Sequence, residues 1–305
     1  MAAGAQARRL SVAVVGLGAV GGGAAGSLAA AGRHDITACT RQSIARFTLE
    51  RAEGTVEAPL RLLAEPAQAK PVDWVLVCTK THQTAAAGPW LARLCTPATR
   101  VAVLQNGIDH TARVTPLAGG ATIVPVLVYF NGERLASDRV RIRHAGSFDA
   151  VVADDDPGRA FVDLFEGTPL RIIRSGDFAT LAWRKLLINA VANPITALTL
   201  QRQAVLRRSD VRDLCRGILD EAVAAARAEG VKLAEDETAR TIATLENFSG
   251  ELGTSMYFDR LAGRRVEVEA LTGAIVAAGD RHGMAMPFNR ALLTLLRAIN
   301  DAISA

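Results

Sequence analysis

Three polar side chains recur at four-residue intervals in an otherwise apolar stretch: Lys185, Asn189 and Asn193. On an α-helix this spacing places all three on one face. Asparagine is unfavourable inside a helix because its side chain competes for backbone hydrogen bonds, so we expect a polar neighbour such as a bound substrate. A lysine ammonium can protonate an oxygen on which negative charge develops. The stripe therefore predicts a substrate pocket; the alternative is a solvated helix face.

A glycine-rich loop near the N-terminus predicts a dinucleotide site. The pattern GxGxxG is formed by Gly16, Leu17, Gly18, Ala19, Val20 and Gly21. It follows a strand-like run and opens a helix, which is the context that such a site requires. The glycines allow a tight turn, close approach of a pyrophosphate and close packing, while the helix N-terminus offers N–H donors. The alternative is a tight strand–helix turn that binds nothing.

The choice of dinucleotide depends on the residues after the second expected strand. An NAD site usually has a carboxylate there, to accept a hydrogen bond from the ribose 2′-hydroxyl. Residues 39–43 contain no carboxylate but contain Arg41, whose planar guanidinium suits a 2′-phosphate. The sequence therefore favours NADP(H) over NAD(H), unless Arg41 is only a solvated surface residue.

The elements that position these residues are expected to form an α/β fold. Buried strands are expected at 10–15, 35–39, 73–78 and 100–104. Helices between them, one ending near Gly32 and one near 82–94, predict a parallel, doubly wound sheet of the Rossmann type. Further strands are expected at 121–129, 139–143 and 149–153, as a more antiparallel edge of the same sheet.

From about residue 178 the apolar spacing becomes helical. We therefore expect two domains. Residues 1–176 should form an NADP-binding Rossmann-type domain and residues 177–305 an all-α domain that carries substrate and catalytic groups. The length of 305 residues is comfortable for two cores.

Composition argues against several other classes of protein. The formal net charge is only +4, without the dense basic stripe and aromatic platforms of a nucleic-acid-binding protein. No apolar run is long enough to span a membrane. The four cysteines have no metal-ligand spacing and the histidines are scattered, so we expect no metal site. Reduced cysteines and the absence of a signal peptide predict a cytoplasmic protein.

The order of motifs resembles the ketopantoate reductase (2-dehydropantoate 2-reductase) family from residue 11 to about 290. The shared features are the glycine loop at 16–21, CTKTHQ at 78–83, QNG at 105–107, the Lys185 helix ending in Asn-Pro, and TSMYFD at 254–259 continuing to GRRVE at 263–267. The Lys185 helix together with the late serine and glutamate is specific, whereas the glycine loop occurs in many families.

The resemblance assigns roles residue by residue. It implies that Lys185 is the proton donor, that Asn189 and Asn193 hold the substrate, and that Ser255 binds the substrate carboxylate. It places Asn106 near both nicotinamide and substrate. Two further residues would lie near the cofactor: Lys80, and Glu267 close to the nicotinamide ribose and the lysine. Glu269 is a rival that the pattern alone does not exclude.

The resemblance implies NADPH-dependent reduction of 2-dehydropantoate to (R)-pantoate, a step toward pantothenate and coenzyme A. One departure concerns Gln203, which stands where the family's enzymes often carry another substrate-holding asparagine. Tyr257 and Phe258 are also bulkier than the usual pair. A reductase of another branched 2-oxo acid is therefore an alternative, and a non-catalytic NADPH-binding regulator is a more distant one. The partner is a small-molecule substrate, and the protein should be a monomer or a homodimer.

Overall fold

A computed structural model describes residues 8–40, 44 and 46–304 of the chain. These residues form two compact units. The first contains the described residues up to Gln105 together with His110–Phe178. The second contains Asn106–Asp109 and the residues from Ala179 onward. A short piece of the loop after one strand of the first unit therefore belongs to the second.

The first unit is built on a six-stranded sheet in which every pairing is parallel, as expected from the sequence. Its strands, in spatial order, are β5 (Arg61–Leu63), β2 (Asp35–Cys39), β1 (Ser11–Val15), β6 (Trp74–Val77), β7 (Arg100–Val103) and β8 (Thr122–Pro125). The chain order runs outward from β1 in one direction and then outward from β6 in the other. Ligands of such sheets bind beyond the carboxyl ends of the strands where the order reverses, which here is between β1 and β6.

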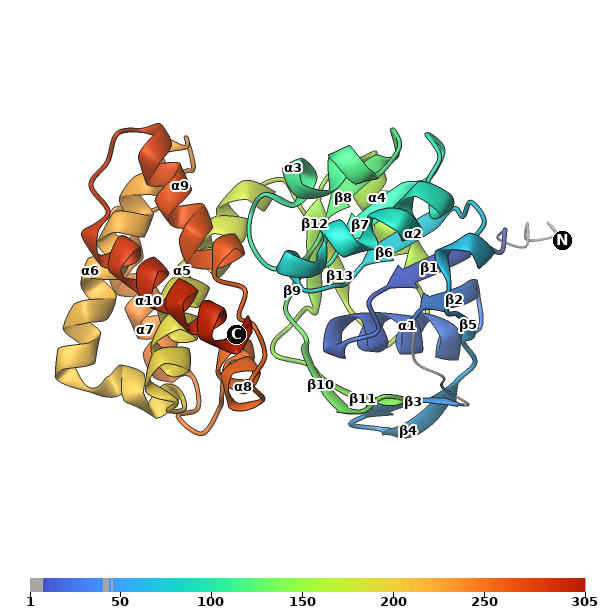
Figure 1. Ribbon diagram of the computed structural model, residues 1–305, viewed down its shortest axis with the longest axis horizontal. Coiled ribbons are helices and arrows are strands. Elements are labelled where there is room, and N and C mark those ends of the chain that lie inside the picture. The colour runs from blue at the N-terminus through green and yellow to red at the C-terminus, as the bar shows by residue number, and fades with distance from the viewer. Residues whose placement is uncertain (1–7, 41–43, 45, 305) are drawn as a thin grey trace, which may run out of the picture. The chain divides into compact units, whose positions relative to one another are not determined.

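Helix α1 (Ala19–Ala31) packs against a second, four-stranded sheet as well as against β1 and β2. This sheet has the spatial order β10 (Asn131–Ala136), β11 (Arg139–Arg143), β3 (Phe47–Arg51) and β4 (Gly54–Ala58). Figure 1 shows it below α1. A Cβ on Gly22 would lie 2.6 Å from the Val140 side chain, and one on Gly23 would lie 2.8 Å from Ile142. The alanine and glycine content of α1 thus allows a helix to be buried on several sides.

The strands after residue 120 do not all join the main sheet. The expectation that they form a more antiparallel edge of that sheet was therefore wrong. Residues 121–129 divide between β8, which is in the main sheet, and β9 (Leu127–Val128). Strand β9 pairs with β12 (Ala150–Ala153), which also pairs with β13 (Ile172–Ser175), in a separate three-stranded sheet. Strand β11 pairs in parallel with β3, far back in the sequence. Such non-local pairing leaves no signal in the local sequence pattern.

The helices of the first unit after α1 are short. They are α2 (Gly88–Leu94), α3 (His110–Val114) and α4 (Asp156–Leu164). The helix expected near 82–94 becomes α-helical only at Gly88, and Pro89 lies in its first turn, where proline is favoured. Before it, Thr81–Gln83 and Ala85–Ala87 are 3₁₀ turns; the other 3₁₀ turns of this unit are Pro66–Gln68 and Thr115–Leu117.

All the regular secondary structure among the described residues of the second unit is helical, as expected. Its helices are α5 (Phe178–Thr199), α6 (Ser209–Ala228), α7 (Glu237–Asn247), α8 (Ser255–Leu261), α9 (Ala274–Arg281) and α10 (Pro287–Ser304). Gln203–Arg207 is a 3₁₀ turn and Glu269–Gly273 a π-helical turn. The core of this unit is formed by apolar side chains of α5, α6, α9 and α10. Among the described residues, no helix is both long and apolar enough to cross a membrane.

Candidate functional site

The glycine loop has the local geometry that a dinucleotide phosphate needs. Gly16 follows β1 with φ +100°, and a Cβ on it would lie 2.7 Å from the Thr79 backbone nitrogen. A Cβ on Gly21 would lie 1.9 Å from the Gly16 carbonyl oxygen. By contrast, a Cβ on Gly18 would meet no other part of the described chain within 4 Å, apart from its chain neighbours and its own helix backbone. Gly18 is the N-cap of α1, where no side chain caps the helix, so the first backbone N–H groups lack an intrahelical partner.

The loop after β6 lies beside the glycine loop because β6 is the neighbour of β1 in the sheet. It carries Thr79 and then the half-buried Lys80. Gln105, after β7, donates hydrogen bonds to the Thr79 carbonyl oxygen at 2.9 Å and to its hydroxyl at 3.0 Å. The first unit thus places the glycine loop and Lys80 at the point where the strand order reverses.

Arg41, on which the preference for NADP(H) depends, lies outside the described residues. The last described residue before it, Thr40, donates its backbone N–H to the Leu63 carbonyl oxygen at 3.0 Å. This bond continues the pairing of β2 with β5.

Helix α5 carries Lys185, Asn189 and Asn193 on successive turns. Asn193 is only 3% exposed. The next residue, Pro194, has no N–H to donate to Ala190 one turn earlier. Asn193 thus lies in the buried part of α5, one turn after Asn189.

Glu267 is a buried carboxylate of the second unit. Its Oε2 accepts a hydrogen bond of 3.0 Å from Asn106 Nδ2. Burial lowers the pKa of Lys185 to about 8, while the negative charge of Glu267 opposes that shift. Asn106 belongs to the second unit, as do Lys185 and Glu267. This unit therefore combines a lysine, a carboxylate and an amide that bonds the carboxylate.

Glu269, the rival glutamate, has different surroundings. Its side chain is 62% exposed, and its two carboxylate oxygens each accept a 2.7 Å hydrogen bond from Arg297. These bonds lower the pKa of Glu269. The structure brings Glu267 together with Asn106 and within electrostatic reach of Lys185, whereas Glu269 is engaged by a surface arginine.

Ser255 is the first residue of α8 and is exposed. The residue before it, Thr254, is the N-cap, and its hydroxyl accepts a 3.1 Å hydrogen bond from the Tyr257 N–H. The same hydroxyl lies 2.7 Å from the hydroxyl of Thr196, which is buried in α5. This contact ties the start of α8 to the part of α5 that follows Asn193. Sequence reasoning missed Thr196 and Thr254, although a threonine before a helix is a common N-cap.

The remaining candidate ligand types do not gather into a metal site. Among the described residues, no group of three or more His, Cys, Asp and Glu side chains could hold a metal ion. His110 is buried and lies 2.8 Å from the Gln105 carbonyl oxygen. His144 and His282 each lie 2.7 Å from a carboxylate, of Asp149 and Glu229 respectively.

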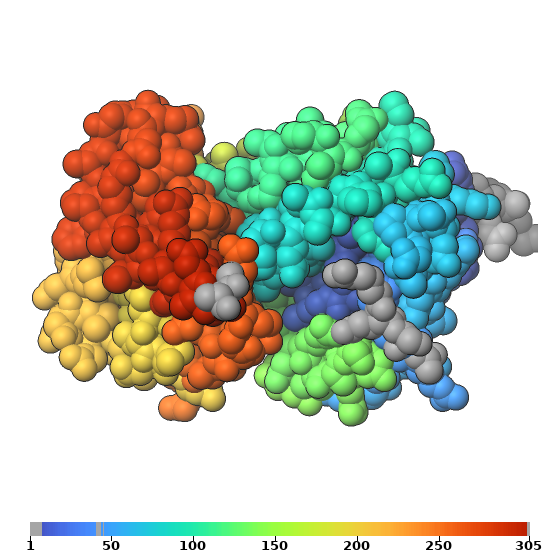
Figure 2. Space-filling view, viewed as in Figure 1, coloured from blue at the N-terminus to red at the C-terminus, as the bar shows by residue number. Residues whose placement is uncertain are grey.

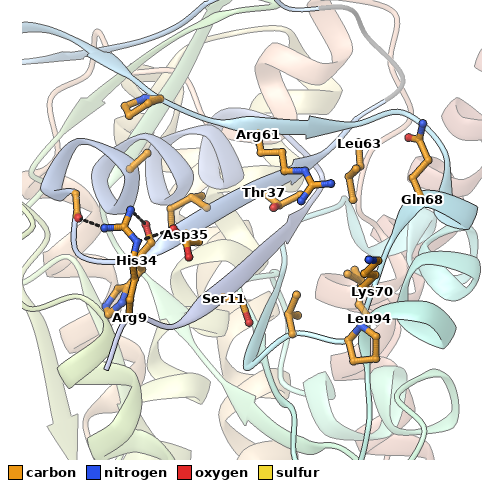
Figure 3. Close-up of a pocket in the computed structure, with 16 residues that line it drawn as sticks. Arg9, Ser11, His34, Asp35, Thr37, Arg61, Leu63, Gln68, Lys70 and Leu94 are labelled. Carbon is orange, nitrogen blue, oxygen red and sulfur yellow. Dashed lines mark hydrogen bonds and ion pairs between the residues drawn. The ribbon is translucent and has the colours of Figure 1, made fainter. Parts of the chain in front are cut away.

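A separate cavity of about 590 Å³ lies in the first unit (Figure 3). Its lining includes Ser11, Asp35 and Arg61, the first residues of β1, β2 and β5. It therefore lies at the amino ends of these strands, whereas the glycine loop follows the carboxyl end of β1. Arg9 is already paired with Asp35 at 2.5 Å within it. This cavity belongs to neither part of the site described above.

Comparisons with known proteins agree with this geometry. Residues 12–156 match the family described as "Ketopantoate reductase PanE/ApbA", and residues 177–300 match "Ketopantoate reductase PanE/ApbA C terminal". The chain is 38% identical to a 2-dehydropantoate 2-reductase of Caulobacter vibrioides, over 94% of this chain and 98% of the relative. It is 36% identical to a 2-dehydropantoate 2-reductase of Mycobacterium tuberculosis, over 95% and 98%.

Solved structures give the same result for the fold. A PanE/ApbA family ketopantoate reductase from Ralstonia eutropha superposes with a TM-score of 0.87 at 29% identity, covering 97% of this chain and 100% of that one. A dimeric ketopantoate reductase from Staphylococcus aureus gives 0.85 at 26% identity, covering 96% and 100%. The family models cover most of the sequence, and the relatives are similar over nearly the full length of both chains. The chain therefore belongs to the ketopantoate reductase family.

Proposed function

We propose that this chain reduces 2-dehydropantoate to (R)-pantoate with NADPH, the reaction for which the relatives are named. The observation that carries the proposal is the group formed by Lys185, Glu267 and Asn106 in the second unit. The amides of Asn189 and Asn193 lie on the same helix as Lys185. A protein that only sensed the cofactor would need the glycine loop but not this group.

The residues of the first unit fit NADPH. Gly16 and Gly21 allow the tight turn and the close packing of the loop, Gly18 leaves room for a pyrophosphate at the start of α1, and Lys80 follows the neighbouring strand. Arg41 would pair with the 2′-phosphate. When bound, NADPH supplies the hydride for the ketone carbon of the substrate. We propose that residues 1–176 form the NADP-binding domain and residues 177–305 the substrate and catalytic domain.

Lys185 acts as the general acid in this proposal. As the ketone carbon gains a hydride, its oxygen becomes an alkoxide, and the Lys185 ammonium donates a proton from Nζ to that oxygen. A pKa of about 8 suits a donor that works near neutral pH. Glu267 keeps the lysine protonated by opposing the effect of burial. Asn106 holds the Glu267 carboxylate, and we place Asn106 and Glu267 near the nicotinamide.

The substrate's other polar groups would be bound by neutral donors. We assign the carboxylate to Ser255, which α8 presents at its first residue. Asn189 and Asn193 would hold the remaining oxygens of the substrate with their side-chain amides, which lie on the same helix as Lys185.

A reductase of another branched 2-oxo acid is the second candidate, and one observation favours it. The side-chain oxygen of Gln203 is buried and has no hydrogen-bond partner among the described residues. Its backbone N–H is bound to the Leu252 carbonyl oxygen at 3.0 Å. A glutamine there differs in reach from the asparagine common in the family, so the substrate-holding groups are not those of every relative.

Steady-state assays with NADPH and a panel of 2-oxo acids test this proposal, with nicotinamide absorbance as the readout. We expect 2-dehydropantoate to give the highest kcat/KM of the panel. A higher kcat/KM for a different branched 2-oxo acid would favour the second candidate. Binding of NADPH without turnover of any member of the panel would leave a non-catalytic regulator as the explanation.

We also propose a cellular location and an oligomeric state. We propose a cytoplasmic enzyme, because all four cysteines are free thiols, as expected in a reducing compartment. We propose a monomer or a homodimer; the Staphylococcus aureus relative is described as dimeric.

A further inference from the structure

Glu267 lies in a segment without regular secondary structure. Between α8 and the π-helical turn at Glu269–Gly273, residues 264–267 belong to no helix or strand. Backbone groups in such a segment have no helix or sheet partners, yet Val266 is almost fully buried. Buried backbone N–H and C=O groups must find hydrogen bonds elsewhere. The position of Glu267 therefore depends on what bonds its neighbours.

Asn300, on α10, supplies both bonds for Val266. Its Oδ1 accepts a 2.8 Å hydrogen bond from the Val266 N–H, and its Nδ2 donates a 3.0 Å hydrogen bond to the Val266 carbonyl oxygen. The Asn300 side chain is itself only 6% exposed. That carbonyl belongs to the peptide group that joins Val266 to Glu267. One buried amide thus holds the backbone directly before the glutamate at two points.

The two ends of Glu267 are therefore held by different side chains of the second unit. Asn300 holds its preceding peptide, and Asn106 donates to its carboxylate at 3.0 Å. Arg297 lies one turn before Asn300 on α10. It binds Glu269, which follows Glu267 by two residues in the sequence. Figure 2 shows α10, in dark red, at the surface of the second unit. A helix at the surface thus reaches a buried catalytic group through one inward amide.

Other charged side chains near these segments already have partners. Asp259 of α8 pairs with Arg264 at 3.1 Å, and Glu269 pairs with Arg297. Arg184, next to Lys185 on α5, donates to Glu237 at 2.8 Å and 3.1 Å. Glu267 carries a negative charge that raises the pKa of Lys185.

We propose that Asn300 is a positioning residue for the reduction: it fixes Glu267 so that its carboxylate faces Lys185. This inference rests on the roles proposed above for Lys185 and Glu267. Asn300 itself touches neither substrate nor cofactor in this account; it acts through the backbone of Val266.

The chain offers a matched control on the same helix. Asn289 is also a fully buried asparagine of α10, and its Nδ2 donates to the Ile218 carbonyl oxygen at 3.1 Å and to Glu221 at 2.8 Å. These partners lie on α6 and not in the segment that carries Glu267. Asn289→Ala should lower the stability of the fold much as Asn300→Ala does, but it should leave the position of Glu267 unchanged.

The test compares Asn300→Ala, Asn289→Ala and Glu267→Gln by titrating Lys185 in the full chain. The sequence has only four lysines, Lys70, Lys80, Lys185 and Lys232, so NMR of ¹³C-labelled lysine can follow Lys185 without any assay of turnover. We expect Asn300→Ala to lower the pKa of Lys185 from about 8 toward its value in Glu267→Gln. A shift of about one unit means roughly tenfold less ammonium above pH 8 and a similar loss of kcat there. Asn289→Ala should titrate like the unchanged protein.

Two results separate this inference from the function on which it rests. If Glu267→Gln lowers the pKa of Lys185 and Asn300→Ala does not, or if Asn289→Ala lowers it equally, Asn300 is a structural residue only and the inference is wrong. If Glu267→Gln itself leaves the pKa unchanged, the proposed role of Glu267 fails. Should Asn300→Ala not fold, Asn300→Thr keeps a hydroxyl for one of the two bonds. It should show a smaller shift in the same direction, and no shift would overturn the inference.

Discussion

Lys185 and Glu267 show how residue chemistry depends on surroundings that a sequence does not display. The four-residue spacing indicated that Lys185 and the two asparagines share a helix face, and the structure places all three on α5. The sequence pattern could not decide between Glu267 and Glu269, because the two glutamates stand at similar distances after the same motif. Burial and partners separate them: Asn106 bonds the first, and Arg297 binds the second at the surface.

The pH dependence of turnover should report this pair. Lys185 must be protonated to act as the acid, so kcat should be level below about pH 8 and fall above it. Glu267→Gln removes the charge that raises the pKa of Lys185, so the falling limb should move to lower pH. Glu269→Gln is the matched control and should leave the limb in place. A pH–rate profile of each variant checks this, and equal shifts in both would contradict it.

Arg41 should determine the preference between the two nicotinamide cofactors. Arg41→Ala removes one charge-assisted hydrogen bond to the 2′-phosphate, which should weaken NADPH binding by about 1.5–3 kcal/mol and leave NADH binding nearly unchanged. Titration of nicotinamide fluorescence with each cofactor measures the difference. As a control, Arg33→Ala removes an arginine that pairs with Glu166 at 2.9 Å near the other end of α1. Equal affinities for NADPH and NADH in the unchanged protein would show that Arg41 is a surface residue.

At the scale of elements, the local pattern predicted what local interactions determine. The strands of the parallel sheet are continuous apolar runs, and the glycine spacing indicated the turn into α1. Strands β3 and β4 were missed because charged and polar residues interrupt their apolar positions. The pairing of β3 with β11, and the packing of this sheet on α1, join segments distant in sequence. No local pattern contains that information.

The contact between this second sheet and α1 makes a testable prediction about the cofactor loop. A Cβ on Gly132 of β10 would lie 2.7 Å from the Ala19 carbonyl oxygen, so Gly132→Ala must displace the first turn of α1. We expect a loss of stability of about 1–3 kcal/mol, as in other overpacked sites, together with weaker NADPH binding.

Gly18→Ala provides the comparison, because the added methyl group meets no described residue within 4 Å beyond its chain neighbours and its own helix backbone. It should weaken NADPH binding while leaving stability nearly unchanged. Urea denaturation and cofactor titration of both variants measure the two effects separately. An unchanged free energy of unfolding in Gly132→Ala would show that β10 does not constrain the loop.

At the scale of the whole molecule, the candidate site residues are distributed over both units. The first holds the glycine loop at the reversal point of its sheet, and the second holds the lysine, the glutamate and the asparagines. The change from strand to helical periodicity near residue 178 was visible in the sequence. The membership of Asn106–Asp109 in the second unit was not. It follows from the packing of Ile108 against the helical core and from the bond of Asn106 to Glu267.

The most direct test of the central claim is turnover of 2-dehydropantoate by Lys185→Ala, measured with NADPH binding on the same preparation. The glycine loop and Arg41 are in a different part of the chain, so NADPH should bind nearly as before. The kcat should fall roughly 10²–10⁴-fold, near the upper end because both the proton and the charge are lost. Lys232→Ala, at an exposed lysine of the same unit, is the control. If Lys185→Ala kept more than about a tenth of the original kcat, Lys185 would not be the proton donor.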